Sequence, residues 1–88
     1  MLGLARKAKT AKRPLTGPKG ERWEAEVCLQ SGTDPQAPRL MVIFRDPTRA
    51  RGDRYTLLPP GSPKDPRAAV ESLPEEAFQR CLARSSPL

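Results

Sequence analysis

Few residues of this chain are of the types that carry out catalysis or hold metal ions. The sequence contains no histidine, so the commonest general base and the commonest zinc ligand are both missing. Its two cysteines, Cys28 and Cys81, are far apart and have no third or fourth ligand beside them, which argues against a structural zinc site. We therefore expect no metal site, no catalytic site and no cofactor.

Two pairs of carboxylates are the remaining candidates for acid–base chemistry. Glu24 and Glu26 alternate with apolar residues, which is typical of the solvent face of a strand. Glu75 and Glu76 fall in the first turn of an expected helix, where the helix dipole favours negative charge. Both pairs have a structural explanation, and the sequence therefore predicts a protein that is not an enzyme.

The strongest chemical feature is the basic segment at the N-terminus. Residues 1–20 hold six cations and no acid, whereas residues 21–88 hold ten cations and ten acids and are neutral. Such an arm can follow the phosphates of DNA or RNA, and without an aromatic residue it would not depend on base sequence. The candidate nucleic-acid-binding residues are Arg6, Lys7, Lys9, Lys12, Arg13 and Lys19.

The same segment has few large apolar side chains and is interrupted by prolines and glycines. Because it cannot bury enough surface to offset the entropy lost on ordering, we expect residues 1–20 to be disordered. Other interpretations are a solubilising extension and an arm that contacts acidic protein surfaces. A mitochondrial transit peptide is a weaker alternative, since the segment has no serine and few arginines.

The folded part is centred on the apolar stretch 39–45. Five large hydrophobic residues stand there between two arginines, with turn-forming residues on both sides. Such a stretch predicts a central strand with apolar side chains on both faces of a sheet. The alternating stretch 22–30 and the stretch 54–58, which ends at two prolines, predict the two flanking strands.

The C-terminal third predicts a helix in one kinked piece or in two parts. Asp65 is a good N-cap, with Pro66 at the first helical position. Ser72 and Glu75 match a capping box, and Pro74 between them requires a kink or a restart. The residues that fall on one apolar stripe are Val70, Leu73, Ala77, Phe78, Cys81 and Leu82.

These elements predict an α+β fold, in which a three-stranded antiparallel β-meander is followed by the C-terminal helix packed on one face. The expected organisation is a single domain, residues 21–88, behind the disordered basic tail of residues 1–20. The face expected under the helix holds Trp23, Val27, Leu29, Tyr55 and Leu57. Met41, Ile43 and Leu58 are expected on the open face, and the alternative is a sheet that turns its other face to the helix.

An apolar open face on a small sheet predicts a binding surface for a protein partner or for a second copy of the chain. The candidate interface residues are Met41, Ile43, Leu58, Arg45 and Arg54. We therefore expect a small interaction module, and the alternative is an accessory protein that binds DNA or RNA through its basic arm. The neutral body favours the first, because it makes up about three-quarters of the chain.

The sequence also predicts where the protein acts. No apolar run approaches the roughly 18 residues that a membrane span needs, and no secretory signal opens the chain. Two cysteines do not form a disulfide-rich scaffold. We expect a soluble, cytoplasmic protein that makes no contact with membranes.

Overall fold

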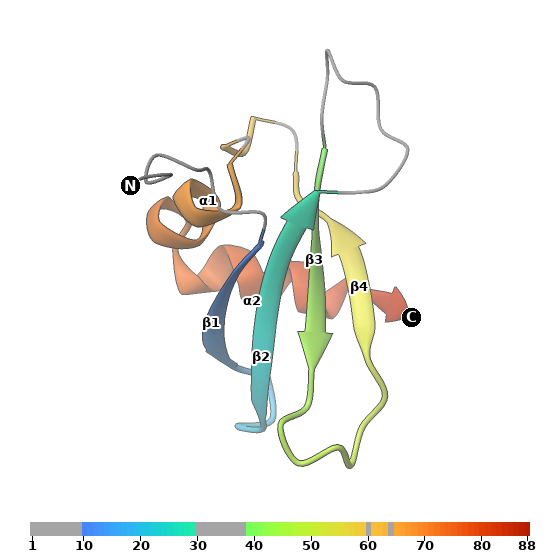
Figure 1. Ribbon diagram of the computed structural model, residues 1–88. Coiled ribbons are helices and arrows are strands. Elements are labelled where there is room, and N and C mark those ends of the chain that lie inside the picture. Colours follow the sequence, from blue (N-terminus) through green and yellow to red (C-terminus); the bar gives the residue numbers. More distant parts are fainter. Residues whose placement is uncertain (1–9, 30–38, 60, 64) are drawn as a thin grey trace, which may run out of the picture.

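Figure 1 shows the computed structural model, which describes residues 10–29, 39–59, 61–63 and 65–88. The described residues form one antiparallel sheet of five strands in the order β1-β2-β3-β4-β5, with both helices on one face. The α+β class is confirmed, but the predicted number of three strands was wrong. The elements are β1 (Thr10–Thr16), β2 (Arg22–Leu29), β3 (Leu40–Arg45), β4 (Arg54–Leu57), α1 (Pro66–Ser72), α2 (Glu75–Ala83) and β5 (Ser86–Pro87).

The first unpredicted strand, β1, lies in the segment that was expected to be disordered. It pairs with β2 along its whole length, and Leu15, opposite Trp23, is only 2% exposed. Pro14 has no N–H to donate, but β1 is an edge strand. Hydrogen-bonded and non-hydrogen-bonded pairs alternate along the β1–β2 ladder, and the nitrogen of Pro14 faces away from β2, so the ladder loses no hydrogen bond. The disorder prediction was therefore wrong for Thr10–Thr16, and residues 1–9 lie outside the described residues.

The second unpredicted strand, β5, follows α2 and pairs with β4. Ser86 lies opposite Tyr55, and the Leu88 amide donates a hydrogen bond to the Asp53 carbonyl at 2.9 Å. This short strand covers part of the outer edge of β4, which the chain would otherwise leave unpaired. The described chain thus returns to its own sheet after the helices.

The core lies between the sheet and the two helices. Alternate residues of β2 and β3 point into it, and five of the six residues of the expected helical stripe pack there, namely Val70, Leu73, Phe78, Cys81 and Leu82. The buried apolar residues are Leu15, Trp23, Ala25, Val27, Leu40, Val42, Phe44, Leu58, Ala69, Phe78, Cys81 and Leu82. The central strand β3 is therefore the middle of the core, as the sequence predicts.

The two-part helix is confirmed, and so is one of its two expected caps. The Asp65 carboxylate accepts the Ala68 amide at 3.1 Å, and α1 ends before Pro74, which precedes α2. The capping box was wrong, because the hydroxyl of Ser72 donates to the Ala68 carbonyl within α1. The carboxylate of Glu75 is used by the sheet instead, where it accepts the Thr16 amide at 3.2 Å.

Helix α2 crosses the sheet and contacts the edge strand β1 on one side and β4 on the other (Figure 1). Near its start, Glu75 accepts the Thr16 amide and Gln79 donates to the Thr16 carbonyl at 3.0 Å. Just after its end, Arg84 donates to the Leu57 carbonyl of β4 at 3.3 Å. The helix thus satisfies main-chain groups that edge strands would leave open to another chain.

Four side chains do not lie where the sequence predicts. Tyr55 and Leu57 lie opposite Ile43 and Met41, so they share the open face and are not under the helices. Leu58 is the next residue after Leu57, so its side chain points to the opposite face, and it is 3% exposed and belongs to the core. Leu29, expected under the helix, stands at the end of β2 and is 50% exposed.

Candidate interaction surfaces

The open face of the sheet carries a group of apolar side chains, which we call the apolar patch. Cross-strand pairing places Met41 beside both Cys28 and Leu57, and Ile43 beside Tyr55. Tyr55 is 36% exposed, and the other four side chains are half-buried. The pleat accounts for this arrangement, because alternate residues of one strand point to opposite faces. The patch comprises Cys28, Met41, Ile43, Tyr55 and Leu57.

Charged side chains of both signs border the apolar patch. Arg45 forms a salt bridge with Glu26 and lies 3.7 Å from the Asp53 carboxylate. The Lys12 ammonium lies 4.0 Å from the Glu24 carboxylate across the β1–β2 pair. Positive and negative groups are therefore matched along this border, and its charge is largely balanced.

Two shallow hollows lie at the charged end of the open face. Lys12, Pro14 and Arg22 line the larger hollow, of about 340 Å³, and Arg45 and Arg49 line the smaller, of about 160 Å³. Both hollows share Glu24 and Pro47, so they are adjacent. Pro47 of the β3–β4 loop therefore lies next to residues on the open face of β1 and β2.

The predicted interface residues separate into two groups. Met41 and Ile43 lie in the apolar patch, and Arg45 lies on its border. Leu58 is buried in the core, and Arg54 lies on the core side opposite Phe44. The Arg54 guanidinium donates to both the hydroxyl and the carbonyl oxygen of Ser85, at 2.8 and 2.5 Å. Neither Leu58 nor Arg54 therefore belongs to the open face.

The described cations of the basic segment do not form one stripe. Lys12 lies on the open face of β1, whereas Arg13 lies on the other face with its guanidinium 5.3 Å from the centre of the Phe78 ring. Lys19 lies in the turn between β1 and β2 and is exposed. The structure thus separates these three cations. The remaining three, Arg6, Lys7 and Lys9, lie outside the described residues.

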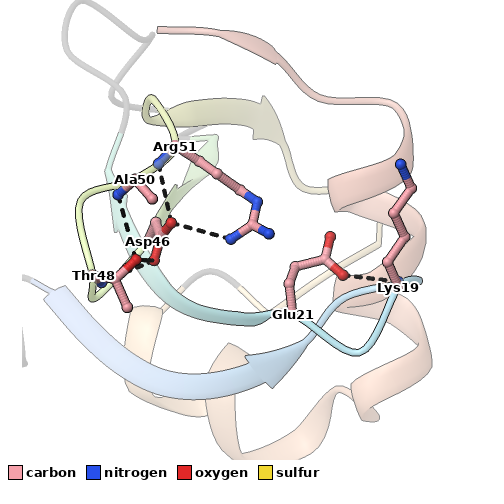
Figure 2. A network of polar contacts seen from close by, with 6 residues as sticks. All are labelled: Lys19, Glu21, Asp46, Thr48, Ala50 and Arg51. Carbon is pink, nitrogen blue, oxygen red and sulfur yellow. Dashed lines mark hydrogen bonds and ion pairs between the residues drawn. The ribbon is translucent and has the colours of Figure 1, made fainter.

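A hydrogen-bond network holds the loop between β3 and β4 (Figure 2). The side chain of Asp46 is 1% exposed and accepts the amide and the hydroxyl of Thr48, at 2.8 and 2.7 Å. Its second oxygen accepts the Arg51 amide at 3.0 Å and lies 3.2 Å from the Arg51 guanidinium. Hydrogen bonds from Thr48, with a further contribution from Arg51, lower the pKa of Asp46 below its ordinary value.

Figure 2 also shows the Arg51 side chain extending toward Glu21, which belongs to the turn between β1 and β2. The guanidinium lies 5.9 Å from the centre of the Trp23 ring. The pKa of Glu21 is lowered by the main-chain amide of Glu21 itself and by the Lys19 amide, which donates to the Glu21 carboxylate at 2.8 Å, despite partial desolvation. Trp23 Nε1 is buried and makes no hydrogen bond among the described residues.

Neither cysteine is activated as a nucleophile. Burial raises the pKa of the Cys28 thiol, with a further contribution from Glu26. Burial also raises the pKa of Cys81.

Within the described ranges, no three or more carboxylates and thiols gather in a way that could hold a metal ion. In the same part of the chain, no helix is long and apolar enough to cross a membrane.

Comparison with protein-family models, with curated proteins and with solved structures gives no match to this chain. One surface was missed at the level of sequence: the β1–β2 turn, which carries Lys19 and leads into Arg22 of β2, lies at the same end of the sheet as the β3–β4 loop with its arginines (Figure 1). In an antiparallel meander, alternate turns share an end. The two segments could have been brought together only if β1 had been recognised as a strand.

Proposed function

We propose that the protein is a small non-enzymatic interaction module, which binds a protein partner or a second copy of itself through the open face of its sheet. The apolar patch carries this proposal, because both helices lie on the other face and leave it uncovered by the described residues. Burying such side chains against another protein would contribute roughly 25 cal/mol for each Å² of apolar surface.

The border of the apolar patch supports a protein as the ligand of this face. Its salt bridges are balanced in sign, and matched charges of this kind fix the register of a protein interface. A phosphate backbone laid on the same face would meet the carboxylates of Glu24 and Glu26. We further propose a cytoplasmic location, because reducing conditions preserve the free thiols of Cys28 and Cys81.

The test compares the full-length wild type with an Ile43→Thr/Tyr55→Thr double variant by sedimentation equilibrium. Threonine keeps strand propensity while it removes apolar area, so self-association through the patch should weaken by at least about tenfold. Leu88→Thr is the matched control, since Leu88 is 65% exposed and lies outside the patch. Its association should equal that of the wild type.

Binding of a different protein is tested through Cys28, the half-buried thiol of the patch. Its rate of alkylation should fall when the purified chain is returned to extract of its source cells, and the double variant should lose this protection. Cys81 is buried and adds little background. A chain that is monomeric at all concentrations, with equal Cys28 alkylation in buffer and in extract, would contradict the proposed function.

The alternative function is sequence-independent binding of DNA or RNA phosphates through the basic N-terminal arm. The six cations of residues 1–20 favour it, since no acid in that segment opposes them. Replacing Arg6, Lys7 and Lys9 by glutamine should then remove salt-sensitive retention on nucleic acid without changing self-association.

A further inference from the structure

Two turns of the sheet come together at one end of the molecule and present basic side chains. Residues 17–21 join β1 to β2, residues 46–53 join β3 to β4, and both segments lie at the same end (Figure 1). We call the exposed basic residues of this end the turn-end cations. They are Lys19, Arg22, Arg49 and Arg51.

The basic residues near the β1–β2 turn lie close to those of the β3–β4 loop. Arg22 and Pro47 line one hollow, and Pro47 and Arg49 line the next, so the two arginines flank the same proline. The charge of Arg51 contributes to the lowered pKa of Glu21, which lies in the other turn (Figure 2). The turn-end cations therefore form one surface that spans two separate segments of sequence.

The acids of this end are buried, or accept a hydrogen bond, or lie near a base other than the turn-end cations Lys19, Arg22 and Arg49. The Asp46 side chain is almost fully buried, and Glu21 accepts the Lys19 amide while packing against Gly17. Asp53 lies near Arg45 on the border of the apolar patch. Among the described residues, no salt bridge joins Lys19, Arg22 or Arg49 to an acid. Glu24 lines both hollows, and it lies 4.0 Å from the Lys12 ammonium. Among the described residues, the charges of this end that lack a partner of opposite sign are therefore positive, although residues 21–88 are neutral as a whole.

The loop that carries two of these arginines is held in a defined shape. The Arg49 amide donates to the Asp46 carbonyl at 2.9 Å, and the Asp46 carboxylate binds Thr48 and Arg51. Arg49 itself has φ 62°, a left-handed conformation in which a residue with a Cβ is uncommon. The loop therefore presents its guanidinium groups from a fixed backbone.

We propose that the turn-end cations bind the phosphate backbone of a nucleic acid. Guanidinium groups match phosphate oxygens with paired hydrogen bonds, and three of the four cations are arginines. A protein interface would need an apolar anchor, but the large exposed hydrophobic residues, Leu29, Tyr55 and Leu88, do not belong to these two turns. Trp23 is buried and offers no ring for base stacking, so recognition is independent of base sequence.

The test measures binding of the full chain to a labelled DNA duplex and to a labelled RNA strand by fluorescence anisotropy. A Lys19→Gln/Arg22→Gln/Arg49→Gln variant removes three turn-end cations and keeps Arg51, which supports the loop. The matched control, Arg39→Gln/Arg67→Gln/Arg80→Gln, removes the same charge from outside both turns, at exposed positions before β3 and on the helices. Circular dichroism checks that both variants remain folded.

The turn-end variant should bind the duplex at least about tenfold more weakly, with a salt slope reduced by about 2 to 3, because each phosphate contact contributes about 0.9. The control should bind within about threefold of the wild type. Equal losses in both variants, or no binding by the wild type, would overturn the proposal. So would competition by polyglutamate equal to that of nucleic acid, or complete loss of binding in an Arg6→Gln/Lys7→Gln/Lys9→Gln variant while the turn-end variant binds normally.

Discussion

At the scale of single residues, Asp46 has the clearest structural role. Its carboxylate is a buried acceptor for two amides, a hydroxyl and a guanidinium, and together these donors define the path of the β3–β4 loop. A buried carboxylate is stable only when its acceptor sites are filled, and here the filled sites connect the end of β3 to the arginines that follow. The ionised form of Asp46 is thus the form that the fold selects.

The pKa of Asp46 gives a prediction about acid stability. Because its pKa is lower in the folded state, its ionisation stabilises the fold above the unfolded-state pKa of about 3.9. That contribution should disappear as pH falls below about 4 and the folded-state carboxylate is protonated. Urea unfolding of wild type and Asp46→Asn should therefore differ most near neutral pH, and the difference should shrink in acid. A difference that stays constant with pH would contradict this account.

At the scale of elements, α2 does more than cover the core. Glu75 and Gln79 bind both main-chain groups of Thr16 on the edge strand β1, and Arg84 binds the Leu57 carbonyl in the part of β4 that β5 does not cover. Unpaired edges invite pairing with a second chain, and these three side chains occupy part of them. The helix therefore holds β1 and the end of β4 to the domain and limits where another strand could add.

The hydrogen bonds of α2 to β1 give a prediction about local opening. Glu75→Ala and Gln79→Ala should each cost roughly 0.5–1.5 kcal/mol, the usual net contribution of one hydrogen bond. Amide hydrogen exchange should speed up in β1 and remain nearly unchanged in β3, since β3 lies at the centre of the sheet. Glu76→Ala is the matched control, because the salt bridge of Glu76 among the described residues is to Arg80 on the exposed side of the helix. Equal effects of all three variants would show that α2 does not secure this edge.

At the scale of the whole molecule, one small core supports two surfaces that point in different directions. The apolar patch lies on the open face of the sheet, and the turn-end cations lie at its end. β1 serves both, since Lys12 borders the patch and the turn after β1 carries Lys19. A domain of this size has little stability to spare, so the extra strand contributes to the core as well as to the surfaces.

The integration of β1 gives a prediction about global stability. Leu15 is buried against the core, so Leu15→Ala should lower the free energy of unfolding by roughly 2–5 kcal/mol. Lys12→Ala, on the open face of the same strand, should change it by less than about 1 kcal/mol. Both values come from chemical denaturation followed by tryptophan fluorescence, since Trp23 lies opposite Leu15. A cost below about 1 kcal/mol for Leu15→Ala would mean that β1 is not part of the folded unit.

The sequence by itself determined the elements whose signals are local. The apolar run around Phe44 specified the central strand, the alternation after Arg22 specified β2, and Asp65 and Pro74 specified the start and the break of the helical segment. Each of these signals comes from neighbouring residues, through side-chain period, capping or a missing amide.

Only the tertiary structure decided the features that depend on partners distant in sequence. β1 has a single large apolar residue, Leu15, and is a strand because β2 offers it a ladder and α2 binds its outer edge. The faces of Tyr55 and Leu58 depend on the register with β3, and a shift of one residue would exchange them. The gathering of Arg22 and Arg49 follows from meander topology, since contacts between separate turns exist only after every strand is paired.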